Sequence, residues 1–397
     1  MKKLIFSAAA LMCASMMFAQ DNDSKVYQNG TNNDSDVFQK GELNESTVDQ
    51  KGLVSASSGE WNDADVEQRG DRNVSKVKQD GDYNIADVRQ VGNDNTAEID
   101  TGVGYAQENI AMTEQLGNNN DSYQKQRYDF NEAYIYQDGN NNIAHQDQNS
   151  NPNQTTPGNY ADANQVGNGN ESYQTQVGHN GGAGAGAYVD QDAISGYAMQ
   201  DQDGNGNLAR VYQGNMQVNN SAWQTQTGDD NFAVSFQNDQ FTTGSNGGKN
   251  KSWQTQEGDD NYAEVDQSGW LVSGYSEKNR AWQTQDGDDN EAVVYQEGFF
   301  NKSNQTQDGD DNLADSFQVG DNNFSRSIQD GDGNIAYATQ FGNDNFARSV
   351  QNGDDNFSNI IQVGDNNTGR VFQTGSFHTS LVDQTGLSNS SITRQKD

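Results

Sequence analysis

The sequence predicts an all-β fold in which the chain winds into a two-sheeted β-solenoid. The prediction rests on a strict eleven-residue period, on Asn and Gln at fixed places in each unit, and on an alternation between neighbouring units. A short period built from Gln, Asn, Gly and small residues is typical of stacked, similar strands and not of a globular core. In the last third of the chain the closing glutamines recur without a slip at Gln307, Gln318, Gln329, Gln340, Gln351, Gln362, Gln373, Gln384 and Gln395.

The start of the chain differs from all that follows. Two lysines precede an apolar run from Leu4 to Phe18, which is too short to span a bilayer, and Ala19 offers a small residue at a cleavage point. We therefore expect a removed secretory signal peptide at 1–19 and a secreted protein. Since Cys13 is the one cysteine, the mature chain can form no disulfide.

The charge balance excludes several classes of partner. The chain holds 58 acidic and 23 basic residues, for a net charge of −35. Such a chain repels nucleic acid and anionic lipid, so we expect no nucleic-acid partner and no membrane insertion. With 31% hydrophobic residues it also resembles a disordered chain in composition, but disorder does not explain Gly and Asn at fixed offsets.

Each unit predicts one strand and one turn. From the fixed Asn to the closing Gln there are seven residues, and side chains alternate between the two faces of a strand. The nearly constant set lies on one face, which we predict to be the inside; in one unit it comprises Asn84, Ala86, Val88 and Gln90. The segment between Gln and the next Asn carries Gly with Asn or Asp, which is typical of a tight turn with positive φ.

The position two residues before the closing Gln shows that the structural repeat is twice as long. There, alternate units carry Gln124, Gln146, Gln174, Gln200, Gln224, Gln254, Gln283 and Gln305, whereas the units between them carry small or aliphatic residues. This alternation predicts two unlike sheets facing each other and a coil of 22 residues with two strands. Thirty-one units give about fifteen coils, and at ~4.8 Å per coil a rod roughly 70–75 Å long.

Stacked amides explain how so apolar-poor a chain could fold. Each inward Gln or Asn meets the same residue one coil away, and each side-chain hydrogen bond in such a ladder contributes ~0.5–1.5 kcal/mol. Small residues fill the thin space between the sheets. The predicted structural ladder includes Asn84, Ala86, Gln90, Gln124, Gln174, Gln224, Gln254, Gln283, Gln305, Gln318, Asn323, Gln329, Asn334, Gln340, Asn345 and Gln351.

We expect a single repeat domain over 20–397, with insertions confined to turns. The first four insertions follow odd-numbered units and the last three follow even-numbered units, so they should leave from opposite edges of the rod. They lie near 52–59, 102–106, 149–158, 178–184, 214–219, 238–249 and 269–278.

Two outward rows are candidates for surface binding. They comprise Trp223, Trp253 and Trp282, and beside them Thr225, Thr255 and Thr284. Aromatic rings on a flat sheet could contact sugars or another fibre, and a threonine row could face ice. Alternatively, the rings stack on each other and stabilise the sheet.

Acidic turns follow the same strands. The pairs are Asp229 and Asp230, Asp259 and Asp260, Asp288 and Asp289, and Asp310 and Asp311. Stacked carboxylates repel, and Ca²⁺ could relieve this repulsion through oxygen ligands. The alternative is that the turns are solvated and keep the rod soluble. No other cofactor is expected.

The unit Q-x-G-x-x-N-x-A-x-x-x-Q, seen at Gln79–Gln90 and Gln329–Gln340, resembles the curlin repeat of bacterial curli subunits. The resemblance implies a secreted subunit that assembles into an extracellular amyloid fibre for biofilm matrix and adhesion, with curli-type secretion and nucleation proteins as partners. The chain departs from that family in its larger number of units, in its alternating Gln ladder, and in lacking a non-repeating N-terminal segment.

The sequence gives little support for catalysis. His145, His179 and His378 are isolated from one another, and no metal-ligand spacing is present. We expect a structural protein that associates end to end through open strand edges. The alternative is a monomeric secreted adhesin that binds glycan or another surface through its aromatic and threonine rows and its insertions.

Overall fold

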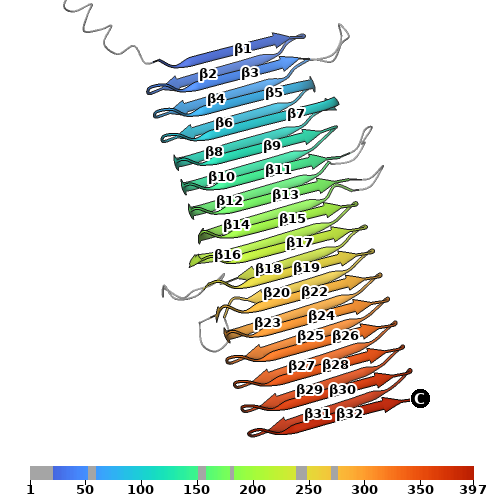
Figure 1. The fold of residues 1–397 in the computed structure, drawn as a ribbon. Coiled ribbons are helices and arrows are strands. Elements are labelled where there is room, and N and C mark those ends of the chain that lie inside the picture. The colour runs from blue at the N-terminus through green and yellow to red at the C-terminus, as the bar shows by residue number, and fades with distance from the viewer. Residues whose placement is uncertain (1–20, 52–59, 151–157, 179–182, 238–247, 270–275) are drawn as a thin grey trace, which may run out of the picture.

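The computed structural model describes residues 21–51, 60–150, 158–178, 183–237, 248–269 and 276–397 (Figure 1). Every regular element in these ranges is a β-strand, and the strands stack into a rod. The first sheet holds sixteen strands: β1 (Asp23–Asn29), β3 (Glu45–Lys51), β5 (Val74–Asp82), β7 (Thr96–Gln107), β9 (Asp121–Arg127), β11 (Ile143–Asn149), β13 (Glu171–Val177), β15 (Tyr197–Asp203), β17 (Ser221–Thr227), β19 (Lys251–Glu257), β22 (Arg280–Asp286), β24 (Lys302–Asp308), β26 (Phe324–Asp330), β28 (Phe346–Asn352), β30 (Thr368–Thr374) and β32 (Ser390–Lys396).

The second sheet is formed by the strands between these. It holds fifteen strands of the solenoid: β2 (Asp34–Lys40), β4 (Asp63–Arg69), β6 (Ile85–Val91), β8 (Ile110–Asn118), β10 (Glu132–Asn140), β12 (Tyr160–Asn168), β14 (Gly186–Ile194), β16 (Leu208–Val218), β18 (Phe232–Gln237), β20 (Tyr262–Gln267), β23 (Glu291–Phe299), β25 (Leu313–Val319), β27 (Ile335–Phe341), β29 (Phe357–Val363) and β31 (Thr379–Thr385). A short extra strand, β21 (Ser276–Glu277), pairs with β23.

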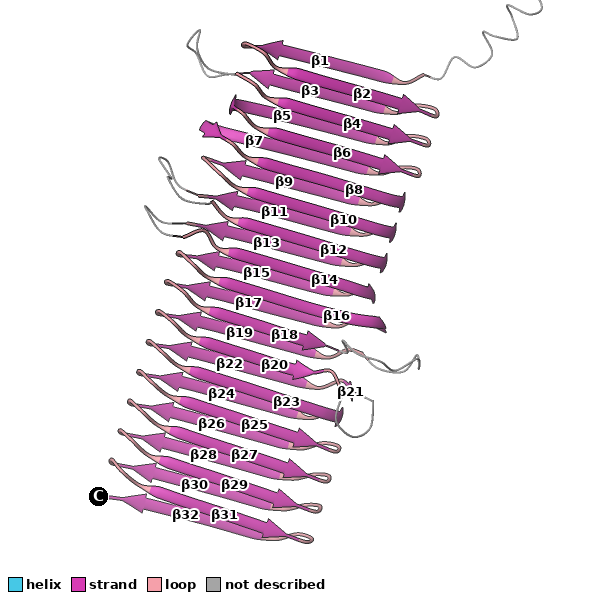
Figure 2. Cartoon of the chain, turned by 180° about the vertical axis from the view of Figure 1, so that it is seen from behind, coloured by secondary structure: helices cyan, strands magenta, loops and turns pink. Residues whose placement is uncertain are grey.

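The predicted two-strand coil is confirmed. All pairing within each sheet is parallel, and each strand pairs with the strand two units away, as in the register of Gln318 with Gln340. Consecutive strands of the chain lie in opposite sheets and run in opposite directions (Figures 1 and 2). The coil is therefore strand, turn, strand, turn.

The predicted inner face is also confirmed. Asn84, Ala86, Val88 and Gln90 are each no more than 1% exposed, and the residues between them are exposed. Apolar burial is confined to small clusters of Ala and Val with a few Ile, such as the cluster around Ile99. The interior is thus mainly amide, with short aliphatic side chains between the sheets.

Most of the described turns contain two left-handed residues. Gly258 has a φ of +112°, and a Cβ atom there would lie 2.2 Å from the carbonyl oxygen of Gly287 in the next coil, so only glycine fits. Asp260, immediately before the fixed Asn, has a φ of 56°, and this second left-handed position recurs along the rod. Only the glycine was predicted, because the second position also holds residues such as Tyr83 and Phe300, which give no turn signal.

The insertions follow strands of the first sheet in the N-terminal half and strands of the second sheet later in the chain. The first four follow β3, β7, β11 and β13 of the first sheet, and the last three follow β16, β18 and β20 of the second (Figure 2).

The expectation that all insertions lie in turns was wrong for 102–106 and 214–219. These extra residues extend β7 and β16 as bulges, marked by register shifts in the pairing with β5 and β14. The signal peptide expected at 1–19, the insertion at 52–59 and most of four others lie outside the described residues.

Candidate self-assembly interface

The closing glutamines form hydrogen-bonded ladders along both sheets. The side-chain Nε2 of Gln318 donates to Oε1 of Gln340 at 2.8 Å, and Gln340 donates to Gln362 at 2.9 Å. In the second sheet this chain of bonds continues from Gln39 to Gln384. Because every amide donates toward the C-terminal end, the ladders have a direction.

The alternating glutamines form a second ladder in the first sheet alone. Gln224 donates to Gln254 at 2.9 Å and Gln254 donates to Gln283 at 3.0 Å. Gln254 also donates to the backbone oxygens of Val234 and Ala263 in the facing sheet, both at 2.9 Å. The ladder therefore ties the two sheets together, a role that the sequence pattern does not reveal.

The fixed asparagines form a third set of ladders with the opposite direction. Oδ1 of Asn323 accepts the backbone N–H of Asn345 at 3.1 Å, and Nδ2 of Asn345 donates to the carbonyl of Gly364 at 2.7 Å. Each Asn thus fixes the turn of one coil to the start of the next strand. These residues are buried, as predicted.

Among the described residues, the strands at the two ends of each sheet pair on one side only. Val26 in β1 is 44% exposed, whereas Val48, its partner one coil further in, is fully buried. Oε1 of Gln28 receives no donor among the described residues, and Nε2 of Gln395 has a backbone acceptor, Thr379, in place of a further glutamine. The terminal coils therefore carry unfinished ladders and unpaired backbone, which can accept another strand.

Comparison with known families accounts for this architecture. A family profile described as Curlin associated repeat matches residues 19–52, 59–92, 76–101, 287–315, 309–342 and 364–395. Parts of the chain are thus similar to curlin repeats. A search of curated proteins gave no significant match. The longest stretch that the profile does not match, 102–286, contains six of the seven insertions, yet its strands still pair in register, as β11 does with β13 and β17 with β19.

The tryptophan row is a continuous ring stack. The ring centroids of Trp223 and Trp253 lie 4.9 Å apart at an interplanar angle of 2°, and those of Trp253 and Trp282 lie 4.9 Å apart at 1°. Because the faces contact each other, the row presents ring edges to solvent. The predicted row Thr225, Thr255 and Thr284 lies beside it, in register and exposed.

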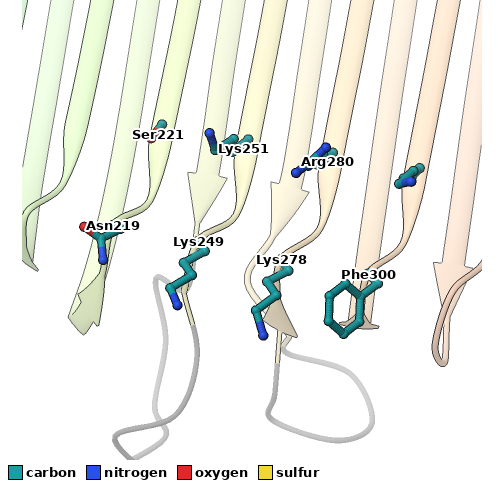
Figure 3. A pocket seen from close by; sticks show the side chains of 8 residues that line it. Asn219, Ser221, Lys249, Lys251, Lys278, Arg280 and Phe300 are labelled. Atoms are coloured by element: carbon teal, nitrogen blue, oxygen red, sulfur yellow. The ribbon is translucent and has the colours of Figure 1, made fainter.

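A basic hollow lies where the strands that carry the tryptophans begin. Figure 3 shows the side chains that line it. It has a volume of about 490 Å³ and is lined by Asn219, Ser221, Lys249, Lys251, Lys278, Arg280, Phe300 and Lys302. Lys251, Arg280 and Lys302 are in direct register on three successive strands, so like charges lie opposite one another.

Several cations near the N-terminal end of the rod are paired. Lys76 contacts Glu98 and Lys78 contacts Asp100, each on the neighbouring strand. In the hollow, Lys278 pairs with Glu277 at 2.6 Å, and no other lining cation forms an ion pair with a described carboxylate. This site was not predicted from the sequence, although basic residues at the same outward position of three alternate units signal it.

The acidic turns lie at the edge opposite the basic hollow. Oδ1 of Asp259 accepts the backbone N–H of Asp229 at 2.7 Å, and Oδ1 of Asp288 accepts that of Asp259 at 2.8 Å. Partial desolvation and the carboxylates of Asp260 and Asp311 raise the pKa of Asp289. Over the described residues no group of three or more His, Cys, Asp or Glu side chains is arranged to hold a metal ion, so the calcium hypothesis gains no support.

The part of the chain that the structure describes contains no helix with the length and hydropathy needed to span a membrane.

Proposed function

We propose that this protein is a secreted structural subunit that polymerises end to end into extracellular cross-β fibres, with biofilm matrix and surface attachment as their use. The open edges of the terminal coils are the observation that carries the proposal. Val26 is half exposed in β1 and its equivalents in the next coils are buried, so stacking would bury the same surface again. A second copy supplies what the ends lack, namely a parallel strand with the same amide spacing.

Polymerisation is tested with the purified chain 20–397. We expect fibres that bind an amyloid dye and diffract at ~4.8 Å along the fibre axis, with seeds that abolish the lag phase. A monodisperse rod that neither binds dye nor elongates seeds would contradict the proposal.

A matched pair of variants tests the role of the open end. Val26→Lys points a charge into the interior of the terminal coil, where it blocks the next subunit but remains accessible to water in the single rod. Tyr27→Lys adds the same charge to the outer face of the same strand. We expect V26K to fold and fail to elongate, and Y27K to elongate as the parent does.

A second candidate function is surface binding, which the basic hollow favours over the predicted Trp and Thr rows. Three in-register cations in a chain of net charge −35 are unfavourable unless an anion neutralises them. A neighbouring hollow of about 350 Å³, lined by Trp282, Lys302, Asn304, Phe324 and Arg326, offers the free face of the last ring of the stack. Cations beside a ring face suit an acidic polysaccharide.

Retention on immobilised heparin, with increasing salt, tests this binding. Elution at lower salt is expected for the combined variant Lys251→Gln, Arg280→Gln and Lys302→Gln. The control variant combines Arg348→Gln and Arg370→Gln, which change two in-register cations further along the same sheet. The control should shift the elution salt concentration less. Equal shifts for the two sets would show binding by general charge and contradict a site at the hollow.

A further inference from the structure

We propose that successive subunits in the fibre are related by a half turn about the fibre axis, so that the two sheets exchange places at every junction. The inference rests on the proposed end-to-end polymerisation and specifies its geometry. It follows from the number of stacked strands.

The solenoid begins and ends in the same sheet. The first sheet contains sixteen strands with β1 and β32 at its ends, and the second contains fifteen with β2 and β31 at its ends. The described stack therefore has an odd number of strands. A continuous solenoid alternates between its sheets, so the strand that would follow β32 belongs beneath β31, in the second sheet.

An unrotated subunit cannot fill that position. If β1 of the next subunit paired with β32, then β2 would lie two strand spacings, about 9.6 Å, below β31. One strand position would remain empty in the second sheet. The facing backbone groups of β31 and β2 would stay unpaired, at a cost comparable to several lost hydrogen bonds.

A rotated subunit fills every position. Strands of the two sheets run in opposite directions, so a half turn about the rod axis gives β1 the direction of β31 (Figure 1). β1 then pairs in parallel with β31, and β2 pairs with β32. Gln384 can donate to Gln28 of the next subunit, and Gln395 can donate to Gln39 of the next subunit, which continues both ladders in their existing direction.

The interior of the rod is suited to this exchange at its ends. The glutamine ladder that distinguishes the two sheets runs only from Gln124 to Gln305. At the same inner position the terminal coils carry Val26 and Val37 at one end and Val382 and Thr393 at the other. The two sheets are therefore alike where they would exchange, and no glutamine faces a valine across the junction.

The outer side chains fit the rotated junction as well. Extending the observed register places Arg394 of β32 beside Phe38 of the next subunit. Within one chain Arg394 already lies over the ring of Phe372 at 5.6 Å, and Arg69 lies over Phe38 at 5.6 Å, so the junction would repeat an existing cation–π contact.

Disulfide cross-linking within preformed fibres tests the proposal. In parallel strands, in-register residues have Cα atoms about 4.8 Å apart, within the range that a disulfide requires. The variant Lys25→Cys with Leu381→Cys places the two thiols in register at a rotated junction. The variant Lys25→Cys with Ile392→Cys places them in register at an unrotated one. All three positions are exposed and lie on the terminal strands, so neither variant can form the bond within one rod.

We expect oxidation of K25C/L381C fibres to give covalent ladders of many subunits, with at most dimers from K25C/I392C. Ladders from K25C/I392C alone, or equal ladders from both, would overturn the half turn. Dye binding and electron microscopy before oxidation distinguish failure of polymerisation from failure of the half turn. A lack of fibres would overturn the proposed polymerisation and this inference with it. Fibres that give the wrong ladder would overturn the half turn only.

Discussion

The Oε1 atom of Gln126 has no hydrogen-bond donor, because Thr101 occupies the ladder position one coil before it. Thr101 is fully buried and is the one closing residue of the repeat that is not glutamine. On its other side, Nε2 of Gln79 donates only to backbone oxygens, those of Asp63 and Asn84. The ladder of the first sheet is therefore interrupted once in an otherwise continuous run.

Restoring the ladder should stabilise the rod. Thr101→Gln should accept from Gln79 and donate to Gln126, and so raise the free energy of unfolding by about 1–3 kcal/mol. Urea denaturation of the monomeric rod measures it. Thr101→Val is the matched control, since it supplies no donor and should give no such gain. A loss of stability in T101Q would contradict the ladder account.

Acidification should stabilise the rod. Burial, and then neighbouring carboxylates, raise the pKa of Asp65 and Asp87, which lie in register on adjacent strands. A carboxyl whose pKa is higher in the folded than in the unfolded state binds protons more tightly when folded, so stability rises as pH falls through the folded pKa toward the ordinary Asp value. The melting temperature, followed by circular dichroism from pH 7 to pH 4.5, measures it.

Two variants check the origin of the pH effect. Asp87→Asn should reduce the rise in melting temperature on acidification. The hydrogen bond from Arg72 lowers the pKa of Asp94, so its contribution to stability is lost only below the ordinary Asp pKa. Asp94→Asn should therefore leave the rise in melting temperature between pH 7 and pH 4.5 unchanged. A melting temperature that falls steadily from pH 7 would contradict this prediction.

The acidic turn column should depend on its acceptor atoms and not on its charge. Asp259→Asn keeps the oxygen that accepts the N–H of Asp229 and removes a charge, so stability should stay equal or increase. Asp259→Ala removes the acceptor and should destabilise by about 1–3 kcal/mol. The chain itself uses Asn343 as the acceptor for Asp321 at the other edge. The melting temperature is measured with and without millimolar Ca²⁺. A large increase in melting temperature with Ca²⁺ that D259N abolishes would restore the calcium hypothesis.

The tryptophan stack should act mainly on stability. Trp253 stacks on both faces and Trp282 on one, so Trp253→Ser should destabilise the rod more than Trp282→Ser, by about 0.5–1.5 kcal/mol for the additional ring pair. Heparin retention should be affected by Trp282→Ser only, because Trp282 alone of the three lines a hollow with Lys302. Equal loss of retention in both variants would favour the row as a sugar platform.

Much of this architecture could be predicted because the repeat makes one local pattern occur in every coil. The inner positions of Asn84 and Gln90, the glutamine alternation and the edges used by the insertions all follow from period and spacing. The left-handed residue before each Asn could not be predicted. The hydrogen bonds of the turn impose this conformation on residues such as Tyr83, which carry no turn signal. The basic hollow was missed since its residues are far apart in sequence and meet only through the coil register.

Electron cryomicroscopy of fibres grown from the purified chain tests the central claim most directly. The account predicts an unbroken stack of parallel strands perpendicular to the fibre axis at ~4.8 Å, continuing through each junction without a vacant position, with about fifteen and a half coils per subunit. Isolated rods of roughly 70–75 Å, or fibres built only by side-by-side packing of capped rods, would contradict it.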